Sequence, residues 1–370
     1  MTSGFVTLIV FLFALGGMIL IHEFGHFIAA RWAGIEVEEF GIGLPSYKLA
    51  TLFKWKGTEF TIHALLLGGF IRPKGENDPT VPGGLASASP WKRLGVLFAG
   101  PMMNLLTAVV VFSFLIGSQG VPVQGSIKID SVAENSPAQQ ANIQAGDILL
   151  AINGQKVTEI SSAISMIKEN LDKPVELLVE RNGEQVTLTA TPLSTRKASE
   201  GALGVGLGSP TRPATFIESV SGGFMVTGIQ AATIAYLPIA LIQGAVAPED
   251  ARFVGFKGIF DMFGVAVKED VSSRQEVSAA PAGASTPKPT NWTLNLIGIL
   301  SISLGVMNLF PIPALDGGRI LFTLPEILFH KRIPAQWENT VNGIAMLLLI
   351  SLMLFVNVMD FVNPAKIPLP

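Results

Sequence analysis

Apolar residues gather in five long runs along the chain, separated by segments that are much more polar. A helix of about 20 apolar residues can cross the hydrocarbon core of a bilayer. Each run reaches or approaches that length, which predicts a membrane protein with several helical spans. The runs cover residues 4–21, 94–117, 223–247, 293–313 and 343–359.

The segment between the second and third runs has a different pattern, with short alternating stretches and turn residues that are typical of a soluble domain. Ser136 and Pro137 predict the start of a short helix, because Ser caps a helix well and Pro fits its first position. Asn182-Gly183 predicts a hairpin turn. Strands are expected at 127–132, 147–152, 175–180 and 185–190, and a second helix at 161–170.

Basic residues between the first two runs indicate the orientation of the chain, because cytoplasmic loops carry an excess of Lys and Arg. We therefore expect this loop in the cytoplasm, and the N-terminus and the polar insertion outside it. The first run has no basic start and no small-residue cleavage site, so we expect it to be retained as a helix. The basic residues are Arg31, Lys48, Lys54, Lys56, Arg72, Lys74, Lys92 and Arg93.

The composition agrees with a membrane protein. Hydrophobic residues make up 49% of the 370 positions and charged residues only 14%, with a mean hydropathy of +0.50. A soluble domain has about a quarter of its residues charged. The net charge of −3 gives no indication of nucleic-acid binding, and the absence of cysteine excludes disulfides and thiolate metal ligands.

The end of the first run carries the residues with the strongest chemical signal, His22-Glu23-Phe24-Gly25-His26. Two histidines four positions apart lie on one face of a helix and can bind one metal ion together. The Glu between them is then close enough to act as a general base. Ionisable residues beside a membrane span are costly, which favours a functional role for all three.

A third metal ligand is expected at Asp316, because a catalytic zinc has three protein ligands and one open position. Pro311 and Pro313 precede it and cannot continue a regular helix. Irregular backbone at membrane depth is tolerated where it is buried in protein or lines a wet cavity. A helix cap is the alternative role for Asp316, and we expect His63 and His330 at the surface.

The run at 223–247 is interrupted by Pro238 and can be interpreted as a fifth span or as a helix lying at the interface. Asp316 can meet His22 only if residue 291 lies on the same side of the membrane as the insertion. An even number of membrane crossings must therefore separate the two. Zero crossings is the simplest solution, so we expect this helix to lie at the interface.

These motifs together resemble the site-2 protease family of intramembrane zinc metalloproteases. The resemblance rests on the His-Glu-x-x-His motif, on Gly100-Pro101-Met102-Met103-Asn104 and on the segment from Asn308 to Gly317, and it covers nearly the whole chain. It implies one Zn²⁺ per chain, bound by His22, His26 and Asp316, with Glu23 catalytic.

The same resemblance implies where substrate is bound. By analogy Asn308 holds the substrate backbone, and the broken segment with Pro311 and Pro313 offers space for an unwound peptide. Two strands expected at 49–53 and 58–64 form a hairpin that dips into the membrane and is followed by Gly68 and Gly69. A simple cytoplasmic hairpin is the alternative. Asn104 is a further candidate for substrate binding, and Asn104 and Asn308 can also be ordinary interhelical hydrogen-bonding residues.

The insertion resembles a PDZ domain, with Ala145-Gly146-Asp147-Ile148-Leu149 at its centre. PDZ domains capture peptide ends by strand addition. Its carboxylate-binding loop is not evident, and Val123-Gln124-Gly125-Ser126 would have to serve. A filter that excludes substrates by size is therefore as consistent with the sequence as a peptide-binding domain.

The predicted fold is a polytopic α-helical protein of the inner (plasma) membrane, with about four transmembrane helices, a membrane-associated β-hairpin and one inserted α/β PDZ-like domain outside the cytoplasm. Its expected partners are the lipid bilayer, single-span membrane protein substrates and a peptide at the PDZ-like domain, with no nucleic acid. The predicted segments are 1–34 (first transmembrane helix), 35–92 (cytoplasmic loop with the hairpin), 93–118 (second transmembrane helix), 122–208 (PDZ-like domain), 209–268 (membrane-associated helices), 269–291 (flexible linker), 292–325 (third transmembrane helix with the Leu-Asp-Gly motif) and 340–362 (fourth transmembrane helix).

The expected function is cleavage of anti-sigma-factor-like substrates or signal-peptide remnants inside the membrane, with the active site toward the cytoplasm. Two other functions remain as alternatives. A membrane adaptor that acts through its PDZ-like domain has no need of His22, Glu23, His26 and Asp316. A metal transporter should carry polar residues through its spans, whereas only one ligand cluster is evident.

Overall fold

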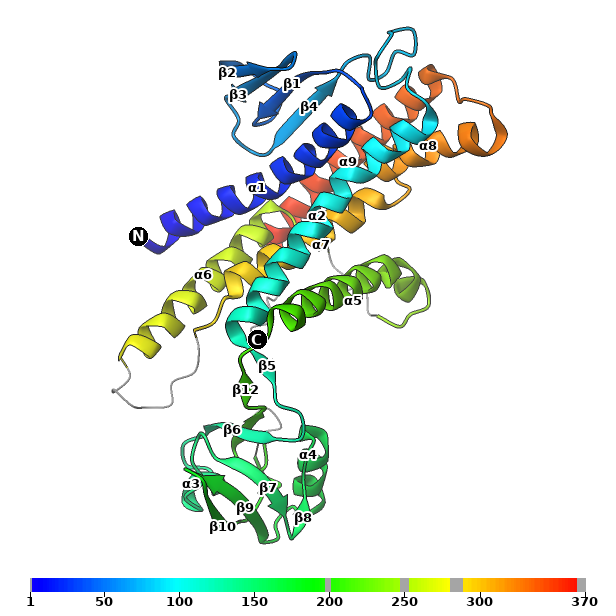
Figure 1. Cartoon of the computed structure of the whole chain (residues 1–370). Helices are drawn as coiled ribbons and strands as arrows, with labels where there is room; N and C mark the ends of the chain where they lie inside the picture. The colour runs from blue at the N-terminus through cyan, green and yellow to red at the C-terminus, as the bar shows by residue number, and fades with distance from the viewer. Residues whose placement is uncertain (1, 197–200, 247–252, 280–288, 365–370) are drawn as a thin grey trace. The chain divides into compact units, whose positions relative to one another are not determined.

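The computed structural model describes residues 2–196, 201–246, 253–279 and 289–364 (Figure 1). Contacts between residues divide the chain into two compact units. The helical unit comprises Met1–Leu115, Ile217–Ala280 and Lys288–Pro370, and the inserted unit is built on Ile116–Phe216. The polar segment between the second and third apolar runs therefore folds apart from the helices that surround it in the sequence.

Five helices in the described part of the chain are long and apolar enough to cross a membrane. Each contains one of the predicted apolar runs or most of it. With this many candidate spans, the chain is a multi-pass membrane protein that also contains β-sheets. The five helices are α1 (Thr2–Trp32), α2 (Pro90–Gln119), α5 (Phe216–Ile242), α7 (Trp292–Leu309) and α9 (Ala335–Val362).

Small residues allow α1, α2 and α7 to approach one another closely. A side chain at Gly25 would collide with the Ala99 carbonyl of α2, and one at Gly100 would collide with the His26 ring of α1. On α7, a side chain at Gly305 would press on the backbone of α2. Close packing through glycine is a usual way for membrane helices to associate, and here it brings α2 directly against the two histidines.

The helix expected over 292–325 is in fact two helices, because α7 ends at Leu309 and α8 (Asp316–Phe329) begins seven residues later. Pro311 and Pro313 lie in the break and lack the N–H group that a continuing helix requires. The Asn342 side chain of α9 accepts a hydrogen bond of 3.0 Å from the Ala314 N–H. The break is therefore held in place, and it puts Asp316 at the first position of α8.

The prediction of a flexible linker at 269–291 is wrong for residues 269–279, which belong to helix α6 (Phe256–Ala279). Asp270 of α6 is buried and accepts hydrogen bonds from the backbone N–H groups of Trp292 and Thr293, at 2.6 and 3.0 Å. An acidic side chain at a helix N-terminus is stabilising, so this contact fixes α6 to α7. Residues 280–288 of the predicted linker lie outside the described residues.

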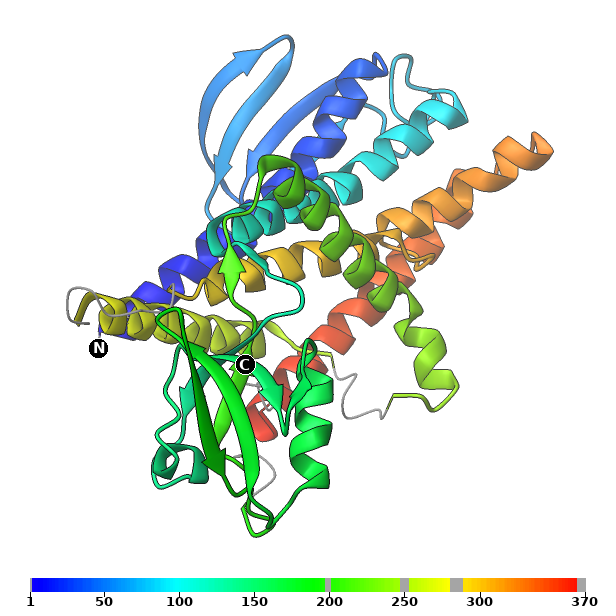
Figure 2. The same cartoon turned by 60° about the horizontal axis from the view of Figure 1, so that its bottom comes forward.

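A four-stranded sheet follows α1 and is larger than the predicted hairpin. Its strands are β1 (Val37–Ile42), β2 (Lys48–Trp55), β3 (Thr58–His63) and β4 (Gly69–Pro73), in the order β2-β3-β1-β4. The two predicted strands correspond to β2 and β3, which pair antiparallel. Both views of the structure show the sheet beside the C-terminal half of α1 (Figures 1 and 2), and β4 is an edge strand.

His63 is buried at 4% exposure, so its predicted surface position is wrong, whereas His330 is exposed as expected. The His63 Nε2 lies 3.1 Å from Glu39 Oε1. The other carboxylate oxygen of Glu39 pairs with Arg72 at 3.0 Å. Burial raises the pKa of Glu39, but hydrogen bonds from Thr61 and His63 and the charge of Arg72 outweigh it and lower the pKa overall. Thr61, His63 and Arg72 thus satisfy the buried carboxylate of Glu39 inside the sheet.

The inserted unit is a sheet packed with two helices, α3 (Pro137–Gln140) and α4 (Ile160–Glu169). Its sheet has the order β10-β9-β7-β6-β11, with β8 (Gln155–Lys156) beside β7, and the four strands predicted for this segment are present. A short ladder of β5 (Val121–Pro122) and β12 (Thr211–Arg212) joins the two ends of the insertion. The strands are β6 (Ile127–Val132), β7 (Ile148–Ile152), β9 (Val175–Arg181), β10 (Glu184–Ala190) and β11 (Val205–Gly208).

A cavity of about 560 Å³ in the inserted unit lies between α4 and the start of β11. The segment Val123–Ser126, expected to form a carboxylate-binding loop, does not line this cavity. Gly201, Leu203 and Gly204 line it instead, just before edge strand β11. The sequence interpretation missed β11, because this short strand contains two glycines and resembles a loop.

Candidate metal centre

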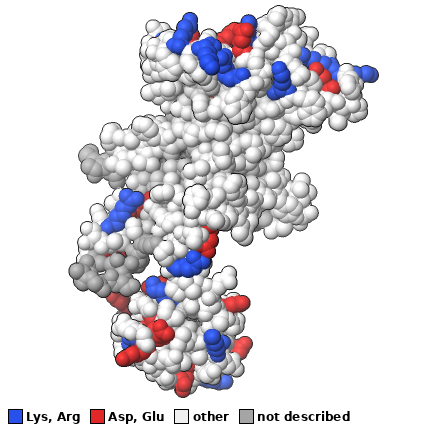
Figure 3. All heavy atoms as spheres, in the orientation of Figure 1, with Lys and Arg blue, Asp and Glu red and all other residues white. Residues whose placement is uncertain are grey.

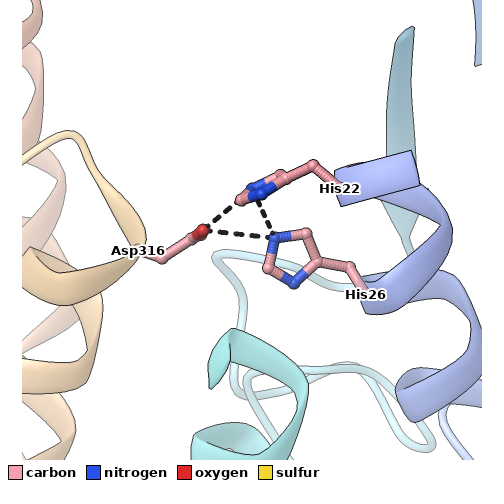
Figure 4. A group of neighbouring side chains, drawn as sticks. All are labelled: His22, His26 and Asp316. Atoms are coloured by element: carbon pink, nitrogen blue, oxygen red, sulfur yellow. Dashed lines mark hydrogen bonds and ion pairs between the residues drawn. The ribbon is translucent and has the colours of Figure 1, made fainter. Parts of the chain in front are cut away.

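Three predicted ligands meet inside the helical unit. His22 and His26 project from α1, and Asp316 projects toward them from the start of α8 (Figure 4). The two Nε2 atoms are 3.1 Å apart, and Asp316 Oδ2 lies 3.1 Å from His22 and 3.2 Å from His26. Among the described residues, this is the one group of three or more His, Asp or Glu side chains able to share a metal ion.

The geometry of the three donor atoms fits a zinc ion. Ligands bound tetrahedrally at about 2.0–2.1 Å from zinc lie about 3.3 Å from one another, close to the distances observed. Both histidines are 7% exposed. No described group donates a well-aligned hydrogen bond to Asp316 Oδ2, although the atom is buried. An unsatisfied buried carboxylate oxygen is costly, and a cation between the three side chains would satisfy it.

Two groups on α2 contact the Nδ1 atoms of the imidazole rings, which face away from the three-ligand cluster. His26 Nδ1 donates a hydrogen bond of 2.7 Å to the Val96 carbonyl, and His22 Nδ1 lies 3.1 Å from the side-chain amide of Asn104. Asn104 is fully buried, and its Oδ1 has no hydrogen-bond partner among the described residues. A half-turn of the amide makes Oδ1 the acceptor for His22 Nδ1–H, which leaves both Nε2 atoms directed at the metal position.

Glu23 lines the same cavity as the three ligands, a space of about 350 Å³ that we call the metal cavity. Its carboxylate lies near the backbone of Ile71 in β4. Glu23 is not part of the ligand cluster. It is therefore free to accept a proton from a water molecule in the cavity.

The remaining predicted substrate-binding residues lie in different surroundings. Asn308 lines the metal cavity, whereas Pro311 and Pro313 do not. Gly68 and Gly69 are buried against Ile19 and Leu20 of α1, where a side chain would collide. Their contribution is to let β4 lie against α1. Asn104 contacts His22, and its full burial leaves it no access to a substrate.

Several residues of the metal cavity were missed in the sequence. Phe70, Ile71 and Pro73 of β4 line it, together with Glu76 and Arg319. The position of Arg319 three residues after Asp316 is the one signal that could have indicated its place, because residues three apart share a helix face. Nothing in the local sequence links Glu76 to Arg319, which lies 243 positions away.

The metal centre agrees with comparisons to known proteins. The family model for peptidase family M50 matches residues 10–352. The chain belongs to peptidase family M50. It is thus a zinc metalloprotease of the site-2 protease family. A relative from Clostridium perfringens is 32% identical, over 95% of this chain and 98% of its own. Another, from Clostridium acetobutylicum, is 31% identical, over 98% of this chain and 99% of its own, and both are named "putative zinc metalloprotease".

Among solved structures, an HtrA-type protease with a decapeptide shares 25% identity over 28% of each chain, with a TM-score of 0.18. That score is too low to indicate a common fold. The M50 assignment rests on the family model and on the full-length relatives.

Replacing Asn104 by Ala should weaken zinc binding about 10–100-fold, the usual effect of removing a group that orients a metal-binding histidine. Competition with a chelator on the purified protein measures the affinity. Asn104→Asp keeps an acceptor oxygen and should retain most of the affinity. Thr107→Ala, one turn along α2, removes only a hydrogen bond to the Met103 carbonyl and serves as control. Equal affinity in Asn104→Ala and the wild type would show that the amide does not position His22.

Proposed function

We propose that this M50 protease cleaves single-span membrane proteins within or beside the bilayer, with His22, His26 and Asp316 as zinc ligands and Glu23 as general base. The observation that carries this proposal is the cluster of His22, His26 and Asp316 with the carboxylate of Glu23 in the same cavity, built on an apolar helix. Ionisable groups in such a position are expensive and mark a functional site.

The chain's own residues account for the proton transfers of peptide hydrolysis. Zinc, when bound, supplies Lewis acidity and lowers the pKa of water toward neutrality. Glu23 accepts a proton from the attacking water and delivers it to the leaving amine. The Val96 carbonyl and Asn104 hold the imidazole rings, and the Ile71 backbone lies near the Glu23 carboxylate.

Substrate binding is proposed at the free edge of β4. A helical peptide must unwind before its carbonyl groups become accessible, and an extended peptide can then add to an open sheet edge. Edge strand β4 carries three residues that line the metal cavity, Phe70, Ile71 and Pro73. Asn308 faces the same cavity from α7 and is suited to bind the backbone of the added strand.

Four of the five candidate helices are proposed to span the membrane, with α5 lying at the interface. Gly223 near the start of α5 rests against Ser113 and Val109, in the C-terminal half of α2. The start of α6 is capped by Asp360 near the end of α9, through Gly255 N–H at 2.8 Å and Gly258 N–H at 3.1 Å.

The middle of α6 lies at the end of the helical unit that contains the N-terminal half of α1 and the C-terminal half of α2. Phe263 of α6 contacts Phe11 in the N-terminal half of α1, and α1 runs antiparallel to α2 because His22 and His26 face Asn104 and Gly100. The starts of α5 and α6 therefore lie at one end of the helical unit. This supports no net crossing by the chain between them.

The charges of the helical unit support the proposed orientation. Lys and Arg side chains gather at the end that carries the four-stranded sheet, next to a broad belt of uncharged surface (Figure 3). By the positive-inside rule this end faces the cytoplasm. The metal centre then lies toward the cytoplasmic side of the inner (plasma) membrane, and the inserted unit lies outside.

The inserted unit is proposed to be a PDZ-like domain that selects substrates. Its cavity combines apolar residues of α4, such as Ile164, with the start of edge strand β11. This arrangement suits a peptide added as a further strand. A domain of this kind would restrict cleavage to substrates already shortened outside the membrane, as in regulated intramembrane proteolysis of anti-sigma factors or signal-peptide remnants.

Glu23→Gln should abolish cleavage of a tagged single-span substrate while zinc remains bound. Loss of a general base typically costs about 10²–10⁴-fold in rate. Purified wild-type and variant proteins are compared in detergent, with bound zinc measured in parallel. Glu38→Gln, at an exposed position of β1, is the matched control and should retain wild-type cleavage.

Equal cutting by the wild type and Glu23→Gln would contradict the role of Glu23. If neither protein cut single-span substrates while both held one zinc, the proposed substrate class would be wrong.

Removing residues 123–210 should loosen substrate choice without affecting the metal centre. Pro122 pairs with Thr211, so the two cut ends lie side by side and a short Gly-Ser linker can close them. Wild-type protein should cut only a substrate with a truncated external segment, whereas the shortened variant should also cut one that retains a folded external domain. Unchanged selectivity in an active, zinc-bound variant would contradict a selecting role.

A further inference from the structure

The metal cavity has a second cavity beside it. This outer cavity is small, about 30 Å³, and is lined mainly by polar side chains that include Arg93, Arg332 and Glu338. Glu76, Leu85, Leu97 and Arg319 line both cavities. These four side chains, which we call the partition, are all that the two linings have in common.

Two members of the partition, Glu76 and Leu85, belong to one segment, residues 74–89 between β4 and α2, which we call the strap. The strap is closed on itself, because the Leu85 N–H bonds the Lys74 carbonyl at 2.9 Å and the Ala86 N–H bonds the Gly75 carbonyl at 3.1 Å. Residues 75–85 thus form a compact loop whose ends are joined. Compact surface loops with close ends are frequently functional, and displacement of this loop would remove two of the four partition side chains together.

Two arginines hold the strap down. Arg319 Nη1 donates to Glu76 Oε1 at 2.6 Å, and its Nη2 donates to Asn77 Oδ1 at 3.2 Å. Arg332 donates to the Ala86 carbonyl at 2.6 Å, close to the joined ends of the loop. Within the loop body, Arg319 provides the side-chain contacts to α8, and the Gly83 carbonyl accepts a hydrogen bond of 3.4 Å from the Glu36 N–H.

The helix that carries Arg319 is anchored independently of the strap. Arg93 of α2 forms an ion pair with Glu326 of α8, so α8 stays attached to α2 when the strap moves. Arg319 lies one turn after Asp316 on the same helix. The same rigid element thus presents a metal ligand to the cavity and a tether to the strap.

The ion pair between Arg319 and Glu76 is weak enough to break and re-form reversibly. The side chains of Arg319 and Glu76 are 24% and 35% exposed, and a partly hydrated ion pair contributes little net free energy. The other two members of the partition, Leu85 and Leu97, are buried at 5% and 6% exposure. Leu85 also packs into an apolar cluster with Phe27 and Val37, so opening of the strap must break this contact as well as the ion pair.

We propose that the strap is a gate between the metal cavity and the aqueous phase, with Arg319 as the positioning residue that holds it shut through Glu76. When the gate opens, the two cavities join into one polar passage that admits water and small hydrophilic solutes. This inference rests on the proposed function in one respect, since hydrolysis at the metal centre requires a supply of water.

The test uses the absence of cysteine from the chain. Leu304→Cys on α7 introduces a single thiol that lines the metal cavity and not the outer one. A positively charged methanethiosulfonate reagent can reach it only through water. The rate of labelling in the zinc-loaded protein without substrate then reports opening of the gate.

Glu76→Gln and Arg319→Gln should each increase the labelling rate about two- to fivefold, the range expected when one partly exposed ion pair is lost. The double variant should label no faster than the faster single variant, because both changes remove the same contact. Lys257→Gln removes a comparable ion pair with Asp261 on α6, away from both cavities, and should label at the wild-type rate.

Bound zinc should remain at one per chain in all variants. Equal labelling rates in every variant, or additive increases in the double variant, would overturn the gate. Loss of zinc from Arg319→Gln would also overturn it, since Arg319 would then act by bracing Asp316. Labelling requires no proteolysis, so failure of the gate is distinguishable from failure of the proposed protease function.

Discussion

The structure depends on bringing one carboxylate into contact with two imidazoles inside an apolar helical unit. His22 and His26 lie on α1, and Asp316 reaches them from α8 at distances of 3.1 and 3.2 Å. Burying such groups without a cation is expensive. The break between α7 and α8 makes the contact possible, because a continuous helix would not place Asp316 at a helix start directed at α1.

The surrounding elements hold this contact in place. Glycines at positions 25 and 100 let α2 pack against the histidines, so that Val96 and Asn104 can reach their Nδ1 atoms. Buried Asp270 caps α7, and buried Asp360 caps α6. The edge strand β4 lines the metal cavity opposite the candidate ligands through Phe70, Ile71 and Pro73. The metal centre is therefore built from several elements, each fixed by backbone hydrogen bonds or by close helix packing.

The sequence predicted the features that depend on local pattern. The apolar runs predicted the five helices that are long and apolar enough to span a membrane. The His-Glu-x-x-His spacing and the Pro-rich segment before Asp316 predicted the three candidate ligands that the structure brings together. Features that depend on distant partners were missed. Residues 269–279 of the predicted linker are helical, and Asp270 fixes them to α7. His63 is buried beside its partner Glu39. Strands β1 and β4 lack a clear alternation, and the Arg319–Glu76 pair joins residues far apart in the sequence.

The most direct test of the proposed metal centre is X-ray absorption spectroscopy at the zinc edge of the zinc-loaded Glu23→Gln protein. We expect one zinc per chain with two imidazole ligands, and with only nitrogen and oxygen donors at about 2.0–2.1 Å. A zinc with one or three imidazoles would contradict it, because His22 and His26 are the only histidines near the site in the described part of the chain.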